Sequence, residues 1–186
     1  MNQIKTLCVM GTFDEQTNQR IRQIKEKLKA QNISIDAYEP HITFGIYTHL
    51  DEISLFKWIS KVVAQHKRFP LSFRHFGFFP DSQFCFLVPC ANYNLLELHS
   101  NIHEQFDSCC TDKGCLYSLN QKSWSPHMTI ASVEPEQVET LFSILSENFS
   151  PFTAELMQLK ITASDASKPI GIFDLKNDVT PLINSF

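Results

Sequence analysis

Two short stretches of this sequence are versions of one another, and they constrain the fold more than any other feature. The first spans residues 38–44 and reads Tyr-Glu-Pro-His-Ile-Thr-Phe, and the second spans 124–130 and reads Trp-Ser-Pro-His-Met-Thr-Ile. Both follow the pattern aromatic, any residue, Pro, His, apolar, Thr, apolar. Each half of the 186-residue chain carries one copy, which favours a fold in which each half contributes an equivalent strand.

Strand periodicity divides each stretch into two faces. Successive side chains in a strand point to opposite sides, so His41 and Thr43 share one face and the neighbouring apolar residues share the other. His127 and Thr129 share a face in the same way. Proline at the start of a strand costs little, because its missing N–H is not needed there. Each strand therefore has an apolar side for the core and a polar side with one imidazole and one hydroxyl.

The rest of the chain predicts strands and helices in the order β-α-β-α-β-β-α-β-α-β-β. Thr12 with Glu15 fits a helix capping box, Pro70 is expected to end a helix, and residues 77–81 and 109–122 are expected to be loops. The pattern predicts one α+β domain over residues 1–186, with two lobes and a cleft between them. Strands are expected at 4–10, 41–47, 71–76, 84–88, 127–133, 152–162 and 170–175, and helices at 14–30, 52–66, from Asn92 or Asn94 to Phe106, and from Pro135 to Leu145.

Composition narrows the class of protein. Hydrophobic residues make up 43% and charged residues 19%, which is typical of a globular domain. The net charge of −4 argues against a broad binding surface for long nucleic acid. No apolar run reaches the ~18–20 residues of a membrane span, and the first residues lack the apolar stretch expected of a signal peptide. We therefore expect a cytoplasmic monomer with reduced cysteines.

The paired polar faces suggest a reaction. If the two strands face each other, two imidazoles lie across a cleft with two hydroxyls beside them. Histidine titrates near neutral pH, so His41 and His127 can stand in opposite protonation states, as a general base and a general acid. The hydroxyls of Thr43 and Thr129 can bind the non-bridging oxygens of a phosphate. The sequence therefore predicts phosphoryl chemistry without a metal or another cofactor.

These motifs resemble those of the two-histidine phosphoesterases, the superfamily of 2′-5′ RNA ligases and cyclic nucleotide phosphodiesterases. The resemblance covers essentially the whole chain. It implies a bilobal, pseudo-twofold fold with two antiparallel sheets flanking a central cleft and helices outside. It also implies a phosphoric diester hydrolase acting on a 2′,3′-cyclic phosphate or a 2′-5′ phosphodiester of a nucleotide or RNA end. His41 and His127 then take the acid and base roles, and Thr43 and Thr129 hold the phosphate.

The chain departs from this family at one position. RNA-acting members often follow the second motif with a basic residue, whereas residues 129–132 here read Thr-Ile-Ala-Ser. This favours hydrolysis of a small substrate over the alternative, ATP-independent 2′-5′ RNA ligation. Ser132 remains a candidate contact for an anion. Trp124, which precedes the second motif, and Phe78 are candidate stacking partners for a base.

Two further hypotheses stay open. A non-catalytic protein that binds nucleotides or RNA ends would use the same cleft. The other is a zinc-stabilised interaction protein built around residues 99–115. His99 and His103 are four residues apart on an expected helix and are followed by three cysteines, and such a group can bind zinc. The cysteines lack a Cys-x-x-Cys spacing, so we expect no metal at Cys109, Cys110 or Cys115.

Overall fold

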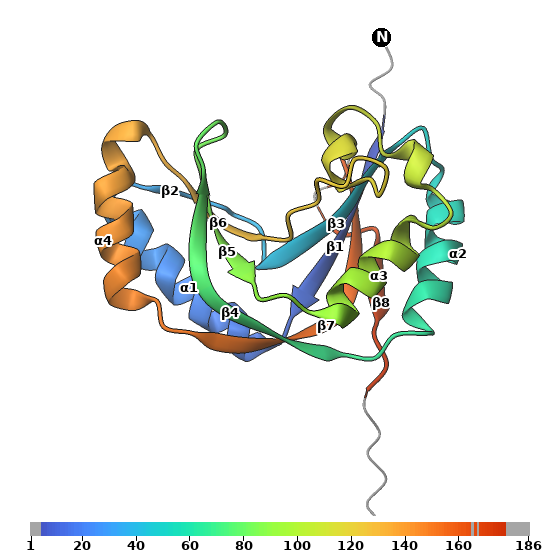
Figure 1. The fold of residues 1–186 in the computed structure, drawn as a ribbon, viewed down its shortest axis with the longest axis horizontal. Coiled ribbons are helices and arrows are strands. Elements are labelled where there is room, and N and C mark those ends of the chain that lie inside the picture. Colours follow the sequence, from blue (N-terminus) through green and yellow to red (C-terminus); the bar gives the residue numbers. More distant parts are fainter. Residues whose placement is uncertain (1–4, 165, 167, 178–186) are drawn as a thin grey trace, which may run out of the picture.

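The computed structural model describes residues 5–164, 166 and 168–177, and its eight strands form one antiparallel sheet (Figure 1). The strand order is β2-β6-β5-β4-β7-β1-β3, and β8 pairs with β7. The strands are β1 (Thr6–Phe13), β2 (Ser34–Ile35), β3 (His41–Thr48), β4 (Phe69–Phe79), β5 (Phe84–Pro89), β6 (Met128–Ser132), β7 (Phe152–Ala163) and β8 (Gly171–Asp174).

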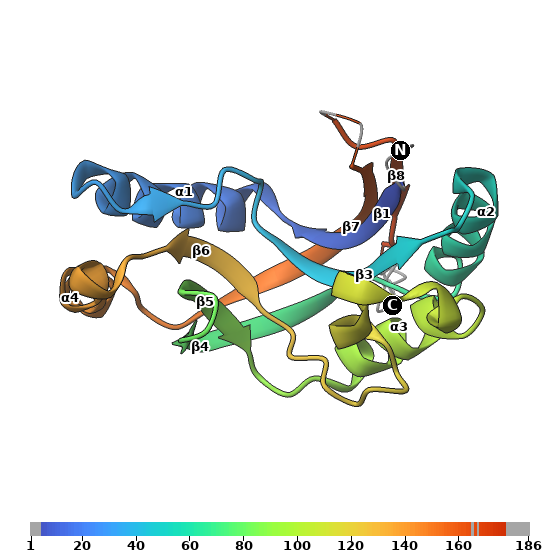
Figure 2. The same ribbon diagram turned by 90° about the horizontal axis from the view of Figure 1, so that it is seen from above.

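Within the described part of the chain, four α-helices cover the sheet in two pairs. They are α1 (Glu15–Ala30), α2 (Glu52–Val63), α3 (Tyr93–His103) and α4 (Val138–Asn148), with short 3₁₀ helices η1 (Asp107–Cys109), η2 (Asp112–Tyr117) and η3 (Pro135–Gln137). Helices α1 and α4 lie beside β2 and β6, and helices α2 and α3 lie beside β3, β7 and β8 (Figures 1 and 2). We call these two parts the His127 lobe and the His41 lobe, after the motif that each carries.

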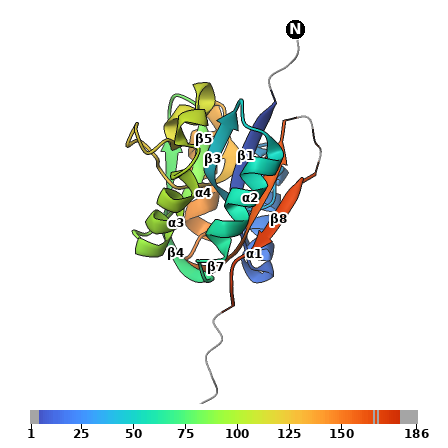
Figure 3. The ribbon, with the colours of Figure 1, turned by 90° about the vertical axis from the view of Figure 1, so that its right-hand side faces the viewer.

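The predicted α+β class with an antiparallel sheet is confirmed, but its two parts are joined differently. We expected two separate sheets, whereas hydrogen bonds between β4 and β7 connect all the strands into one. The lobes also interleave along the chain. Helix α1 belongs to the His127 lobe although it precedes His41, and β7 lies in the His41 lobe beside β1 and β8 (Figure 3). A pseudo-twofold relation between the sequence halves stays a prediction.

The predicted cap of the first helix is wrong. Thr12 is the partner of His41 and Gln158 in the sheet, so β1 continues past it to Phe13. Asp14 is the N-cap instead, and its carboxylate accepts the Thr17 N–H at 2.8 Å. The carboxylate caps the helix better than a threonine hydroxyl, because its charge adds a favourable interaction with the helix dipole to the hydrogen bond.

Strand β4 is longer than predicted. Helix α2 ends at Val63 and Pro70 lies inside β4, so this proline does not end a helix. The strand continues through the predicted loop at 77–81 as far as Phe79, because these residues pair with β5. The predicted loop at 109–122 instead contains η2 and part of η1.

The predicted two faces of the motif strands are confirmed on the core side. Ile42 and Phe44 of β3, and Met128 and Ile130 of β6, are fully buried in the hydrophobic core. Burial of side chains of this size stabilises the fold by about 1.5–3 kcal/mol each, which fixes the register of both strands. Among the described residues, no helix is both long and apolar enough to cross a membrane.

Candidate active site

The two motif strands share a matched irregularity directly after the threonine. In β3, Thr43 is opposite Met10 and the next paired residue is Gly45, so Phe44 is an extra residue. In β6, Thr129 is opposite Phe86 and Ala131 is opposite Cys85, so Ile130 is the extra residue. Such β-bulges bend a strand and re-aim its side chains, and they are frequent beside active sites. The two motifs therefore share backbone structure as well as residue pattern.

The two motif histidines are held by the same hydrogen bond. Nδ1 of His41 lies 2.8 Å from the carbonyl oxygen of Glu39, and Nδ1 of His127 lies 2.7 Å from that of Ser125. A carbonyl oxygen only accepts, so Nδ1 carries the proton in both rings. In the neutral rings, Nε2 is consequently the nitrogen with a free lone pair. A proline lies between each carbonyl and its histidine, and its ring fixes one backbone torsion of the segment that makes this contact.

A cavity of about 510 Å³ contains three of the four motif side chains. Thr43, His127 and Thr129 line it, so residues of both lobes meet there. His41 lines a neighbouring cavity of about 350 Å³. A larger groove of about 900 Å³ runs along α1 to Asn148 and contains no motif residue, so its size does not connect it with this chemistry.

Aromatic rings surround His127. The Phe79 and Phe86 ring centroids lie 5.2 and 5.3 Å from that of His127, and the two phenylalanine rings are 4.1 Å apart. Burial lowers the pKa of His127, because the charged imidazolium loses hydration among these rings. The charge of His41 lowers it further, and only the Ser125 carbonyl acts in the opposite direction. His127 therefore favours its neutral form when His41 is protonated.

Polar and charged groups surround His41 instead. Tyr38 makes an edge-on contact with its ring at 6.1 Å and is 69% exposed. Lys160 of β7 forms an ion pair with Glu39, and both line the same cavity. Thr12 also lines it, and its buried hydroxyl has no hydrogen-bond partner. Lys160 is not predictable as a site residue from the sequence, because the only signal is its polar character between two buried residues of β7.

Cys8 lies in this second cavity but is not an activated nucleophile. Burial raises the pKa of its thiol to about 12, although hydrogen bonds with Thr43 and Thr162 act against the shift. At neutral pH the thiol is therefore protonated, and thiols attack as thiolates.

Trp124 connects the two motifs. Its Nε1–H donates to the Thr43 carbonyl at 3.1 Å, and its ring stacks on His99 with a centroid distance of 3.7 Å. The same side chain also lines the cavity of His127. The structure thus gives Trp124 a positioning contact that the sequence does not reveal, while a contact with substrate stays a prediction.

The two other candidate contacts lie elsewhere. Phe78 packs against the hydrophobic core, whereas its neighbour Phe79 lines the cavity, because alternation along β4 turns the two side chains to opposite faces. Phe84, the first residue of β5, lines the cavity as well. Ser132 is the last residue of β6, pairs with Ser34 and Phe84, and is not among the residues that line the cavity.

The 109–122 segment, just before the second motif, contributes to the site. Leu116 and Tyr117 of η2 line the cavity of His127. Burial raises the pKa of the Tyr117 hydroxyl, which lies against the side chain of Thr43. Tyr117 is not among the predicted site residues, because nothing in an irregular segment indicates which side chain turns inward.

The fold and the site define a class of protein: an antiparallel α+β fold with two His-x-Thr strands, in which Thr43, His127 and Thr129 line one cavity and His41 lines a second. The family model of the 2′-5′ RNA ligase superfamily matches residues 12–167, and the chain belongs to this superfamily. The resemblance to two-histidine phosphoesterases is thereby confirmed, and the chain's activity is of the phosphodiesterase and ligase type.

Solved structures support the fold assignment. The chain is similar to Escherichia coli LigT in its apo form, with a TM-score of 0.65 and 14% identity, covering 94% of this chain and 99% of that one. It is similar to TT0787 of Thermus thermophilus, with a TM-score of 0.65 and 13% identity, covering 93% and 99%. A structure described only as a phosphoesterase gives a TM-score of 0.66 at 14% identity, covering 94% and 99%. Among curated proteins no relative matches.

Proposed function

We propose that this protein is a metal-independent phosphodiesterase that hydrolyses a 2′,3′-cyclic phosphate or a 2′-5′ phosphodiester of a nucleotide or RNA end. The observation that carries the proposal is the matched fixing of His41 and His127, each through Nδ1 to a backbone carbonyl, which leaves Nε2 available for proton transfer. The cleft beside them holds the hydroxyls of Thr43 and Thr129. Solved structures of LigT with ATP and with 3′-AMP are consistent with a nucleotide ligand for this fold.

The two histidines take different roles in this mechanism. His127, kept neutral by its aromatic surroundings, accepts a proton from the attacking water at Nε2. The water oxygen bonds to phosphorus, the bond from phosphorus to the 2′ or 3′ oxygen breaks, and His41 donates its Nε2 proton to that oxygen. The product is a phosphomonoester with a free hydroxyl. Thr43 and Thr129 donate hydrogen bonds to the non-bridging oxygens, where charge accumulates in the transition state.

RNA ligation is the second candidate, because the same site run in reverse joins a cyclic phosphate to an RNA 5′-hydroxyl. Assays with a 2′,3′-cyclic phosphate end, with and without a 5′-hydroxyl acceptor, distinguish the two by their products. Binding without turnover of any of these substrates would support the non-catalytic hypothesis instead. Both motifs come from one chain, so we propose a monomer. The six cysteines are free, which is consistent with a reducing cytoplasm.

The test uses three matched histidine-to-asparagine variants, assayed in EDTA on 2′,3′-cyclic mononucleotides and 2′-5′-linked dinucleotides. Asparagine retains a donor near Nδ1 but removes Nε2, so His41→Asn and His127→Asn should each lose about 10²-fold or more in kcat. His49→Asn is the control, because His49 is exposed and its φ of 56° suits asparagine. Full activity in either motif variant would refute the proposed roles.

A further inference from the structure

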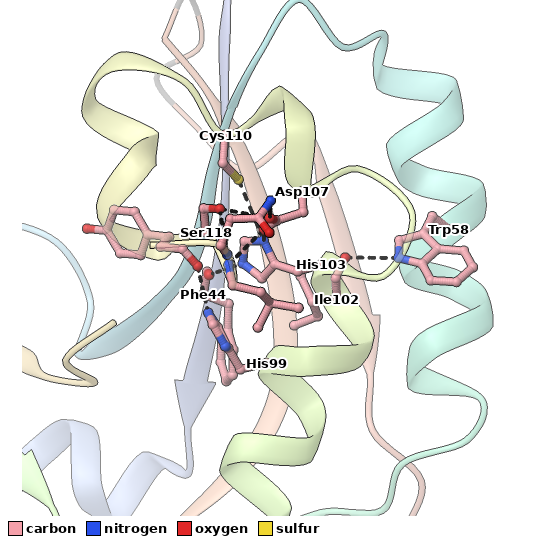
Figure 4. Close-up of polar contacts among 11 residues, drawn as sticks. Phe44, Trp58, His99, Ile102, His103, Asp107, Cys110 and Ser118 are labelled. Carbon is pink, nitrogen blue, oxygen red and sulfur yellow. Dashed lines mark hydrogen bonds and ion pairs between the residues drawn. The ribbon is translucent and has the colours of Figure 1, made fainter. Parts of the chain in front are cut away.

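A buried cluster outside both cavities brings together three side chains that can ligate a metal (Figure 4). Nδ1 of His103, at the end of α3, lies 2.9 Å from Oδ1 of Asp107 and 3.6 Å from Sγ of Cys110. The three potential ligand atoms all lie within 4.8 Å of one another. His103 is fully buried and Cys110 is 6% exposed, so water competes little for these groups.

Both ring nitrogens of His103 face hydrogen-bond acceptors, so the neutral ring cannot satisfy both contacts. Its Nε2 lies 2.7 Å from the Phe44 carbonyl, which only accepts, so Nε2 carries a proton. In the neutral ring, Nδ1 then presents a lone pair to the carboxylate of Asp107 and to the sulfur of Cys110. Lone pairs facing each other at 2.9 Å repel unless a cation lies between them. That cation is either a second proton on His103 or a metal ion.

The carboxylate of Asp107 is already held by hydrogen-bond donors of the kind that surround a metal-ligating carboxylate. Its Oδ2 accepts from the Ser118 hydroxyl at 2.7 Å and the Asn120 amide at 2.9 Å, and its Oδ1 accepts from the Leu119 N–H at 2.9 Å. One lone pair of Oδ1 therefore remains, next to Nδ1 of His103. Metal-ligating histidines typically donate their other N–H to a carbonyl, as His103 does to Phe44, and ligating carboxylates are hydrogen-bonded in turn.

We propose that His103, Asp107 and Cys110 form a three-ligand zinc site, and that solvent reaches the fourth position beside Asp107, the partly exposed member of the three. Nitrogen, oxygen and thiolate ligands in a tetrahedral arrangement suit Zn²⁺ among the common divalent ions. With Zn–N near 2.05 Å and Zn–S near 2.3 Å, a tetrahedron places nitrogen and sulfur about 3.6 Å apart, as observed, and nitrogen and oxygen about 3.4 Å apart. The Asp107 oxygen therefore has to move about half an ångström away from Nδ1 of His103. It also has to approach Sγ of Cys110, because the three atoms lie within 4.8 Å of one another and a tetrahedron needs about 3.5 Å between oxygen and sulfur.

The charges of this site balance. A thiolate and a carboxylate together neutralise Zn²⁺, so binding leaves no net charge in a buried environment, where an unpaired charge is costly. The ion would connect the end of α3, the η1 segment and, through the Phe44 carbonyl, strand β3 next to Thr43. It would also fix Asp107, which holds the 118–120 turn. Its role is to stabilise the segment that carries Tyr117 into the cleft, and the phosphodiesterase reaction itself needs no metal.

The test measures metal binding directly, with untagged full-length protein stripped of metal and titrated with Zn²⁺ or Co²⁺. We expect one ion per chain, a sulfur-to-cobalt charge-transfer band in the near ultraviolet, and a rise in Tm of about 5–10 °C at Zn²⁺ a hundredfold above its Kd. His103→Gln keeps a donor for the Phe44 carbonyl but removes the Nδ1 ligand, and Cys110→Ala removes the thiolate. Both should lose the cobalt band, whereas Cys90→Ala, a half-buried cysteine after β5, should keep it.

Two results would overturn the proposal. A wild-type protein that takes up neither ion would make a second proton on His103 the missing cation. A cobalt band that persists in Cys110→Ala would place the thiolate ligand elsewhere. Cys110→Ala alone decides the question if His103→Gln does not fold, as judged by circular dichroism. Because the readout is metal binding, it is independent of whether the proposed phosphodiesterase activity is found.

Discussion

The two tryptophans of the chain offer a matched test of how the site is held in place. Trp124 donates its Nε1–H to the Thr43 carbonyl at 3.1 Å, and Trp58 donates its Nε1–H to the Ile102 carbonyl at 3.0 Å. Both side chains are half-buried and pack against the core. Replacing either one with phenylalanine keeps most of the aromatic packing and removes one hydrogen bond to a backbone carbonyl. A difference in activity between the two variants therefore reports whether it matters that the released carbonyl belongs to Thr43 and not to Ile102.

The structure predicts equal costs in stability and unequal costs in activity. A single hydrogen bond contributes about 0.5–1.5 kcal/mol net, so each variant should lower Tm by about 2–4 °C. Trp124→Phe also releases the carbonyl of a residue whose hydroxyl is proposed to bind phosphate. Displacements of about 1 Å in such groups cost up to about 10²-fold in rate, so we expect a loss of about tenfold in kcat. Trp58→Phe, beside α3, should keep wild-type kcat.

The assay combines thermal unfolding with hydrolysis of the best 2′,3′-cyclic or 2′-5′-linked substrate, at a temperature well below both midpoints. If both variants lose activity in parallel, general destabilisation explains the loss and the positioning role of Trp124 is refuted. If Trp124→Phe retains full kcat, the hydrogen bond to the Thr43 carbonyl does not position the site. A larger change in KM than in kcat would indicate that Trp124 contacts the substrate directly.

Three further predictions concern charge. Burial lowers the pKa of His127, so activity should fall only below the ordinary histidine range as pH drops, and Phe79→Leu, which admits water, should move this acidic limb of the pH–rate profile to higher pH. Lys160→Gln removes a cation from the cavity of His41 and should raise KM about tenfold with little change in kcat; an unchanged KM would contradict this role. Asp14→Ala should cost about 1 kcal/mol in urea unfolding at pH 7. Burial raises the pKa of Asp14, but backbone hydrogen bonds lower it more, so the pKa lies below the usual aspartate value. The stability difference between wild type and Asp14→Ala should therefore shrink as pH falls from the usual aspartate value through this lowered pKa.

The sequence predicts the parts of the site that follow from local pattern. Alternation in the motif strands correctly separates Ile42 and Met128, which are buried, from the polar residues between them. It fails where the register depends on a partner strand. Phe78 and Phe79 are equivalent in the sequence, and only the pairing of β4 with β5 decides that Phe79 lies at the cavity. The same limit explains Thr12, whose place in the sheet depends on His41 and Gln158.

Residues that reach the site from distant segments were not predictable for a related reason. Lys160 and Tyr117 are brought to the cleft by a strand and a 3₁₀ helix whose positions depend on tertiary packing. The same limit applies to the cluster of His103, Asp107 and Cys110. The sequence suggests His99 with His103 as a ligand pair because they are four residues apart on a helix. In the structure His99 stacks on Trp124, and its Nε2–H donates to the Tyr117 carbonyl at 2.9 Å. Only His103 joins Asp107 and Cys110.

The position of β3 in the sheet explains why Trp124 and His103 both donate hydrogen bonds to its backbone. Strand β3 lies at the end of the sheet order, so its outer edge has no neighbouring strand among the described residues, and the bulge at Phe44 removes one further residue from the ladder. Buried backbone carbonyls need donors, and here side chains supply them. Trp124 donates to the Thr43 carbonyl and His103 to the Phe44 carbonyl. The first motif is thus fixed by two ring N–H groups, one from the start of the second motif and one from the proposed metal ligand. A metal at His103 would therefore stabilise the backbone on which Thr43 depends without touching the substrate.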